Sequence, residues 1–141
     1  IGNQSVVLVL DVKKHRFRNK YKIFINNGRL DTELDLFEFI NKVGDKNLGE
    51  IVINCIDSDG TMNGYNIELI SQVRKTVKLP LTLLGGAGSL NHITDLIAQH
   101  NIIGAAAGSL FVFKGPYKAV LINYPKEKEK KQIFNAVNLF K

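Results

Sequence analysis

The fold of this chain is decided by residues 50–65, EIVINCIDSDGTMNGY. After Glu50 it has three consecutive β-branched residues, Ile51, Val52 and Ile53, which are typical of a buried strand. Apolar residues then recur at spacings of three and four, which predicts a helix over residues 66–77. Asp57 and Asp59 therefore lie on the loop that leaves the C-terminal end of a strand, where α/β proteins build their active sites. A plain turn would use the same residue types.

The rest of the chain repeats this strand-and-helix unit. The sequence predicts apolar strands over residues 5–10, 79–84 and 102–107, and helices over residues 34–43, 90–100 and 126–140, with a short helix beginning at residue 108. Residues 21–25, followed by Asn26-Asn27-Gly28, predict a β-hairpin. Strands this apolar need helices to cover them, so we expect a parallel sheet in one α/β domain over residues 1–141.

Composition narrows the classes of function. The single cysteine, Cys55, excludes an internal disulfide and fits a reducing cytoplasm, and no apolar run is long enough to cross a bilayer. Much of the net charge of +6 lies in residues 13–22 and 126–131, and the second segment alternates in sign like a solvated helix face. Small anionic ligands are favoured over nucleic acid. The three histidines share no metal-ligand spacing with other residues, so we expect no metal and no cofactor.

Polar groups follow the other strands as well. Asp11 comes directly after the first strand, where it either reaches a ligand, caps a helix or pairs with Lys13 or Lys14. The loop Gly85-Gly86-Ala87-Gly88 and the pair Gly108-Ser109 each stand between a strand and a helix. Backbone N–H groups of such loops bind phosphate, although glycines also make ordinary tight turns.

Three motifs together resemble one known family. Asp57-Ser58-Asp59-Gly60-Thr61, Gly85-Gly86-Ala87-Gly88 and residues 106–111 have the order and spacing found in HisF, the cyclase subunit of imidazole glycerol phosphate synthase. The resemblance runs from residue 2 to about residue 113 and covers only the C-terminal half of the family. It implies strands five to eight of a (β/α)8 TIM barrel, with barrel units over residues 1–123 and a C-terminal helix over residues 124–141.

The resemblance also implies roles for single residues. Asp11 matches the general acid of ring closure, whose partner base lies on a strand that this sequence does not contain. Asp59 matches a catalytic aspartate that lines the substrate site, and Glu50 matches a member of the gate through which ammonia enters the barrel. A surface Glu at the barrel bottom is the alternative for Glu50. The phosphate- and substrate-binding positions are Gly60, Gly85, Gly86, Gly108, Ser109, Asn54 and Asn27.

Some positions depart from the family pattern. Asn54 replaces a threonine, Leu84 a serine, Val112 a histidine found in many cyclases, and Glu33 a glycine. A site made for a polar substrate loses hydrogen bonds through such changes. The combination of Asn54, Leu84, residues 108–113 and residues 119–125 resembles the HisF-like branch of surface-polysaccharide pathways, which supplies ammonia for acetamidino sugars.

Three functions follow. The chain is part of a cyclase that converts PRFAR to imidazole glycerol phosphate and AICAR in histidine biosynthesis, or part of an ammonia supplier for acetamidino sugars of lipopolysaccharide, O-antigen or flagellin glycans. Alternatively it is a non-catalytic half-barrel that self-associates through its exposed strand edges. The expected partners are a HisH-like glutaminase and a phosphorylated small molecule, in the cytoplasm and without nucleic acid or membrane.

The sequence does not begin with Met, and it lacks the first catalytic aspartate of the family. We therefore expect a fragment that, alone, binds phosphate weakly and does not turn over substrate.

Overall fold

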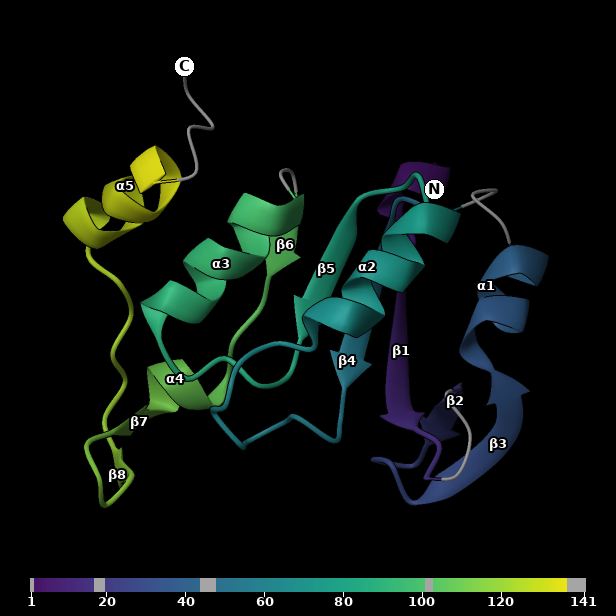
Figure 1. The fold of residues 1–141 in the computed structure, drawn as a ribbon, viewed down its shortest axis with the longest axis horizontal. Coiled ribbons are helices and arrows are strands. Elements are labelled where there is room, and N and C mark those ends of the chain that lie inside the picture. Colours follow the sequence, from purple (N-terminus) through teal and green to yellow (C-terminus); the bar gives the residue numbers. More distant parts are fainter. Residues whose placement is uncertain (1, 17–19, 44–47, 101–102, 137–141) are drawn as a thin grey trace.

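The computed structural model describes residues 2–16, 20–43, 48–100 and 103–136. Its main feature is a six-stranded sheet in the order β3-β2-β1-β4-β5-β6, shown in Figure 1. The strands are β1 (Val7–Lys14), β2 (Tyr21–Ile25), β3 (Leu30–Asp35), β4 (Glu50–Cys55), β5 (Leu81–Leu84) and β6 (Gly104–Ala105), with a separate pair β7 (Phe113–Lys114) and β8 (Ala119–Val120). The helices are α1 (Leu36–Val43), α2 (Ile67–Thr76), α3 (Leu90–His100), α4 (Ser109–Val112) and α5 (Glu127–Ala136), and a 3-10 turn spans Asn3–Ser5.

The four strands β1, β4, β5 and β6 run parallel, which confirms the expected parallel α/β sheet. Their register places Asp11 beside Asn54, and Asn54 beside Leu84. The predicted hairpin is also present, since β2 pairs antiparallel with both β1 and β3. Its turn uses Asn26, Asn27 and Gly28 at φ of 54°, 56° and 75°, a left-handed conformation that asparagine and glycine tolerate best.

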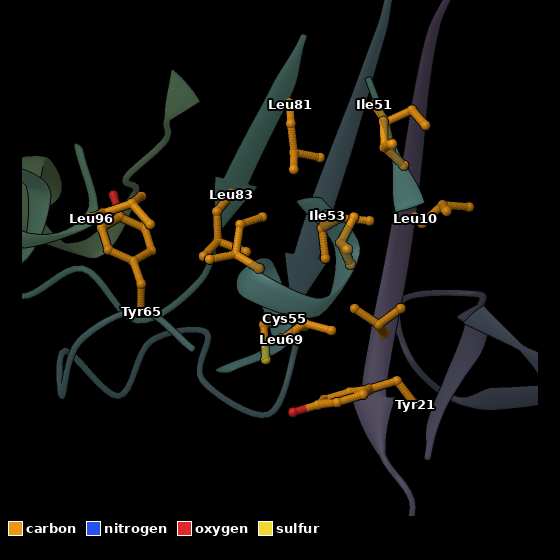
Figure 2. Packing of buried hydrophobic residues seen from close by; sticks show 14 of the residues in the cluster. Leu10, Tyr21, Ile51, Ile53, Cys55, Tyr65, Leu69, Leu81, Leu83 and Leu96 are labelled. Carbon is orange, nitrogen blue, oxygen red and sulfur yellow. The ribbon is translucent and has the colours of Figure 1, made fainter. Parts of the chain in front are cut away.

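The hydrophobic core lies on one face of the sheet. Along β4, Ile51, Ile53 and Cys55 are buried, whereas the alternate positions are only partly covered. Figure 2 shows side chains from β1, β4 and β5 gathered against Leu69 of α2. On the other face, Val9 of β1 stays 57% exposed. Parallel sheets are normally covered on both faces, so this second face is the one that lines the interior of a barrel.

Several predicted boundaries were wrong. The helix predicted from residue 34 begins at Leu36, because Asp35 ends β3 and its carboxylate accepts the N–H groups of Phe37 and Glu38 at 2.9 and 3.2 Å. The strand predicted over residues 5–10 runs to Lys14, and the one predicted from residue 79 begins at Leu81. The β7–β8 hairpin was not predicted.

Two other predicted elements extend beyond the described residues. Of the strand expected over residues 102–107, only Gly104–Ala105 pairs with β5, and residue 102 is not described. The C-terminal helix is present as α5 up to Ala136, and the rest of its predicted span is not described. α5 packs on α3 and contributes the buried Ile133 to the core. The division into residues 1–123 and 124–141 stays a prediction. Within the described ranges, no helix has the length and apolar character needed to span a bilayer.

His100 gives the fold a predicted pH dependence. It ends α3, with its Nε2 3.5 Å from the Ser71 hydroxyl of α2. Desolvation, together with the nearby charge of Arg74, lowers the pKa of His100 below its ordinary value of 6.5. Protonation therefore favours the unfolded chain, and this contribution to the free energy of unfolding is complete above pH 6.5 and declines as the pH falls below it.

We expect His100→Gln to flatten the loss of stability between about pH 7 and pH 5, because the variant has no imidazole to protonate. Urea titrations of both proteins at several pH values check this. Equal slopes of unfolding free energy against pH would contradict it.

Candidate functional site

The C-terminal ends of the parallel strands meet at one edge of the sheet. The arrowheads of β1, β4 and β5 point to the lower side of Figure 1, where α4 also lies. The loops that follow β4, β5 and β6 therefore converge at this edge, as active-site loops do in barrels. Most of the residues that the sequence singled out lie on these loops.

A small recess at this edge collects the glycine-rich segments. It has an empty volume of about 180 Å³. Its lining consists of Asp59, Gly60, Gly85, Gly86, Ala87, Ala107, Gly108 and Ser109. Five predicted phosphate-binding residues are thus brought together, from three loops that are far apart in the sequence.

Glycine is required at the centre of the recess. Gly85 and Gly86 have φ of 99° and 103°, which L side chains rarely adopt. A Cβ on Gly86 would stand 2.0 Å from the carbonyl oxygen of Gly64, and the Gly64 N–H donates to the Gly86 carbonyl at 2.8 Å. The glycine loop and the loop after β4 therefore touch through their backbones, and no larger residue fits between them.

A wider groove, with an empty volume of about 760 Å³, lies beside the recess. It is lined by Asp11, Lys13, Asn27, Gly28, Asn54, Ile56 and Asp59. Asp59, which is exposed, lines both cavities. Asp59 therefore connects the recess to the groove that contains Asp11.

Asp11 is held by an amide. The Asn54 Nδ2 donates to Asp11 Oδ1 at 2.8 Å, while Asn54 Oδ1 is buried without a hydrogen-bond partner in the described part of the chain. Lys13 instead donates to the Gly28 carbonyl at 3.1 Å, and Lys14 pairs with Glu68 at 3.4 Å. These contacts leave the Asp11 carboxylate directed into the groove and aligned by Asn54.

The two loop aspartates have different roles. The Asp57 carboxylate accepts the backbone N–H of Lys14 at 2.8 Å, and so ties the loop to β1. Asp57 lines neither of the two cavities just described. The sequence alone does not reveal this difference, because the Lys14 contact spans 43 residues.

Glu50 lies at the opposite end of β4. Its Oε1 accepts a hydrogen bond from the Thr82 hydroxyl of β5, on the barrel-facing side of the sheet. The space for this contact exists because Gly104 has no side chain, as a Cβ there would stand 1.8 Å from the Thr82 hydroxyl oxygen. Hydrogen bonding to Thr82 accounts for a partly buried carboxylate at this position.

A larger cavity, with an empty volume of about 950 Å³, is far from these loops, beside β3 and α1. Its acidic lining residues include Asp35 and Glu38, which pair with Lys20 at 3.7 and 3.8 Å. It contains none of the glycine loops and none of the predicted site residues. We therefore place the candidate site at the strand ends, where the volume is smaller and the polar groups converge. The described residues contain no cluster of three or more metal-ligating side chains.

Tyr65 connects two of the site loops, and sequence reasoning assigned it no such contact. Its hydroxyl donates to the Ala106 carbonyl at 2.8 Å, which joins the loop after β4 to the end of β6. Burial raises the pKa of Tyr65 to about 12, so the donor proton is retained throughout the physiological range. The tyrosine at the end of the loop motif was the only sequence signal for this contact.

Tyr65→Phe should lower the free energy of unfolding by about 1 kcal/mol, because the partly buried Ala106 carbonyl loses its donor while the ring still fills its space. Urea unfolding of the two proteins measures the difference. The matched control is Tyr117→Phe, since the Tyr117 side chain is 94% exposed and should leave stability unchanged. An equal effect of the two changes would show that the Tyr65 hydrogen bond contributes nothing.

Comparison with known proteins supplies the family. A family model described as "Histidine biosynthesis protein" matches residues 1–118. A Vibrio vulnificus protein named "Putative imidazole glycerol phosphate synthase subunit hisF3" is 50% identical over 132 residues, which cover 94% of this chain and 51% of that protein. A Leptospira borgpetersenii protein, "Putative imidazole glycerol phosphate synthase subunit HisF", is 49% identical over 95% of this chain and 53% of its own length.

The third relative is "Imidazole glycerol phosphate synthase subunit HisF" of Clostridium botulinum (strain Okra / Type B1), which is 40% identical over 89% of this chain and 50% of its own length. The chain spans about half the length of the curated relatives it matches. These matches confirm the resemblance to HisF, and with the parallel sheet they confirm the half-barrel α/β fold. The chain belongs to the histidine biosynthesis protein family, as a relative of HisF.

Proposed function

We propose that this chain forms the phosphate-binding half of an imidazole glycerol phosphate synthase cyclase, which uses ammonia from a HisH-type glutaminase to convert PRFAR to imidazole glycerol phosphate and AICAR. The observation that carries the proposal is the position of Asp59, which lines both the glycine recess and the groove that contains Asp11. A phosphate anchor and two carboxylates are thereby adjacent at one edge of the sheet.

In this proposal the backbone N–H groups of the recess and the Ser109 hydroxyl bind the substrate phosphate at its glycerol end. Asp11 gives a proton during ring closure, and Asn54 fixes the direction of its carboxylate. The group that gives a proton needs a second group that takes one, and the resemblance to HisF assigns this opposing base to the other half of the barrel. The half-length chain alone is therefore expected to be inactive.

Ammonia would enter at the other end of the barrel. Glu50 and Asn54 are four residues apart on β4, which corresponds to about 13 Å along a strand. The barrel-facing side of β4 between them carries Val52, which is apolar and suits the passage of neutral ammonia. In the proposal, Glu50 and Thr82 form part of the gate to the glutaminase.

A second candidate is supply of ammonia for an acetamidino sugar. The observation that favours it is the register pair of Asn54 and Leu84, which places an amide and an apolar side chain side by side at the strand ends. A leucine here removes hydrogen bonding that a polar ribulosyl substrate would use. The phosphate recess is the same in both functions, and only the acceptor of ammonia differs.

A third candidate is a non-catalytic half-barrel that self-associates. Its support is the uncovered sheet face, on which Val7 and Val9 are 49% and 57% exposed. Apolar strand faces of this kind are normally covered. Sedimentation of the purified chain would detect this assembly.

The test of the first candidate uses the full-length gene product together with its glutaminase. Turnover of PRFAR is followed spectrophotometrically, once with ammonia and once with glutamine, and we expect turnover with both. Absence of turnover in a protein that still binds inorganic phosphate would reject the cyclase and favour amidination of a sugar. Absence of both activities would favour the non-catalytic half-barrel.

A further inference from the structure

His92 lies directly behind the glycine loop, in the first turn of α3. Its Nδ1 accepts the backbone N–H of Gly88 at 3.1 Å, and its own backbone N–H donates to the Ser89 hydroxyl at 3.3 Å. An imidazole nitrogen that accepts a hydrogen bond carries no proton. The neutral ring is therefore the tautomer with its proton on Nε2.

The same imidazole also lies against the loop after β4. A Cβ on Gly64 would stand 3.8 Å from three atoms of the ring, which is ordinary van der Waals contact. The backbone N–H of the same Gly64 donates to the Gly86 carbonyl of the glycine loop at 2.8 Å. A Cβ on Gly88 would stand 2.0 Å from the Met62 carbonyl oxygen. His92 thus packs where two of the three loops of the recess meet.

The backbone N–H of Gly88 connects the His92 contact to ligand binding. Gly85, Gly86 and Ala87 line the recess, whereas Gly88 does not, and the Gly88 N–H is used by His92. The hydrogen bond fixes the end of the glycine loop at the point where α3 begins. Without an acceptor at Nδ1, the Gly88 N–H has no partner in this conformation, and the loop loses its anchor to the helix.

We infer that His92 is a positioning residue of the phosphate site, whose Nδ1 holds the glycine loop in the conformation that forms the recess. The inference rests on the proposed phosphate-binding function, which it extends to a residue that touches no ligand. It predicts that an acceptor at the position of Nδ1 is needed, and that the imidazole as such is not.

The test measures binding of inorganic phosphate to the full-length protein by calorimetry. His92→Ala should weaken phosphate binding about tenfold, because the loop must be ordered by the ligand instead of by the side chain. His92→Asn, whose Oδ1 can replace Nδ1 as acceptor, should bind within about threefold of the original protein. The matched control is His100→Ala at the other end of α3, which should leave phosphate binding unchanged.

Two further measurements separate positioning from a merely structural role. Nitrogen-15 spectra of the histidine side chains should show the Nε2–H tautomer at His92, and hydrogen exchange of the Gly88 amide should speed up in His92→Ala and recover in His92→Asn. If His92→Ala does not fold, His92→Asn is compared with His92→Gln, whose amide reaches the position of Nε2 instead. Of these two variants, we expect only His92→Gln to bind phosphate weakly.

The outcomes distinguish failure of the proposed phosphate site from failure of the positioning role of His92. A protein that binds no phosphate before substitution overturns the proposed phosphate site and the inference with it. Binding that is equal in His92→Ala and the original protein, or in the asparagine and glutamine variants, overturns the inference alone. An Nδ1–H tautomer at His92 also overturns it.

Discussion

Replacing Asp11 by Asn in the full-length protein is expected to lower kcat for PRFAR turnover about a thousandfold, with KM changed by less than about threefold. Asn keeps an oxygen where Asp11 Oδ1 accepts the Asn54 amide, so the side chain retains its place in the groove. It has no proton to give at the reacting centre, and an effect on kcat alone is the sign of a group that acts in the transition state.

The control is Asp57→Asn on the neighbouring loop. Asp57 accepts the Lys14 N–H through an oxygen that the asparagine also carries, and it lines neither the recess nor the groove. Its turnover should stay within about twofold of the original protein, as expected for a residue outside the site. If Asp11→Asn retained more than about a tenth of the original kcat, the general-acid role of Asp11 would be rejected.

Leu83→Ala is expected to lower the free energy of unfolding by about 3 kcal/mol, the usual cost of a cavity in a packed core. Leu83 of β5 is completely buried on the face that the helices cover, and Figure 2 shows it beside the core side chains of β4. The surrounding structure relaxes only partly around such a cavity, because the hydrogen bonds of the sheet hold the strands in place.

Urea titration measures this effect as a shift of the midpoint with an unchanged slope. The matched control is Leu34→Ala, the same chemical change at a side chain that is 47% exposed in β3. It should cost less than about 1 kcal/mol. A cost of the same size at both positions would mean that the core does not lie on the face described here.

The sequence was most informative where patterns are local. The apolar run of residues 50–53 predicted β4, the helical spacing predicted α2, and Asn-Gly predicted the β2–β3 hairpin. The β7–β8 hairpin was missed because each strand has only two residues, too few for a pattern. The start of α1 was missed because Asp35 ends a strand and caps a helix at once.

The sequence singled out the glycines of the candidate site, but not the contacts of the side chains that hold its loops in place. Gly85, Gly86 and Gly108 were singled out because glycine-rich loops between strands and helices can present backbone N–H groups to a phosphate, and the structure brings these three residues into one recess. Tyr65 and Asp57 act through backbone groups 41 and 43 residues away, and no pattern in a single sequence marks such contacts. The half-barrel itself came from the resemblance, since local patterns do not count the missing strands.

The recess walled by backbone atoms has an evolutionary consequence. Gly85 and Gly86 leave no room for a larger residue, whereas Asn54 and Leu84 extend side chains from the ends of β4 and β5. Under the proposed function, anchoring of the phosphate and choice of the reacting partner are therefore specified by separate positions. A lineage can exchange its chemistry at two strand ends while inheriting the same anchor, and a duplicated gene needs few steps to acquire a new pathway.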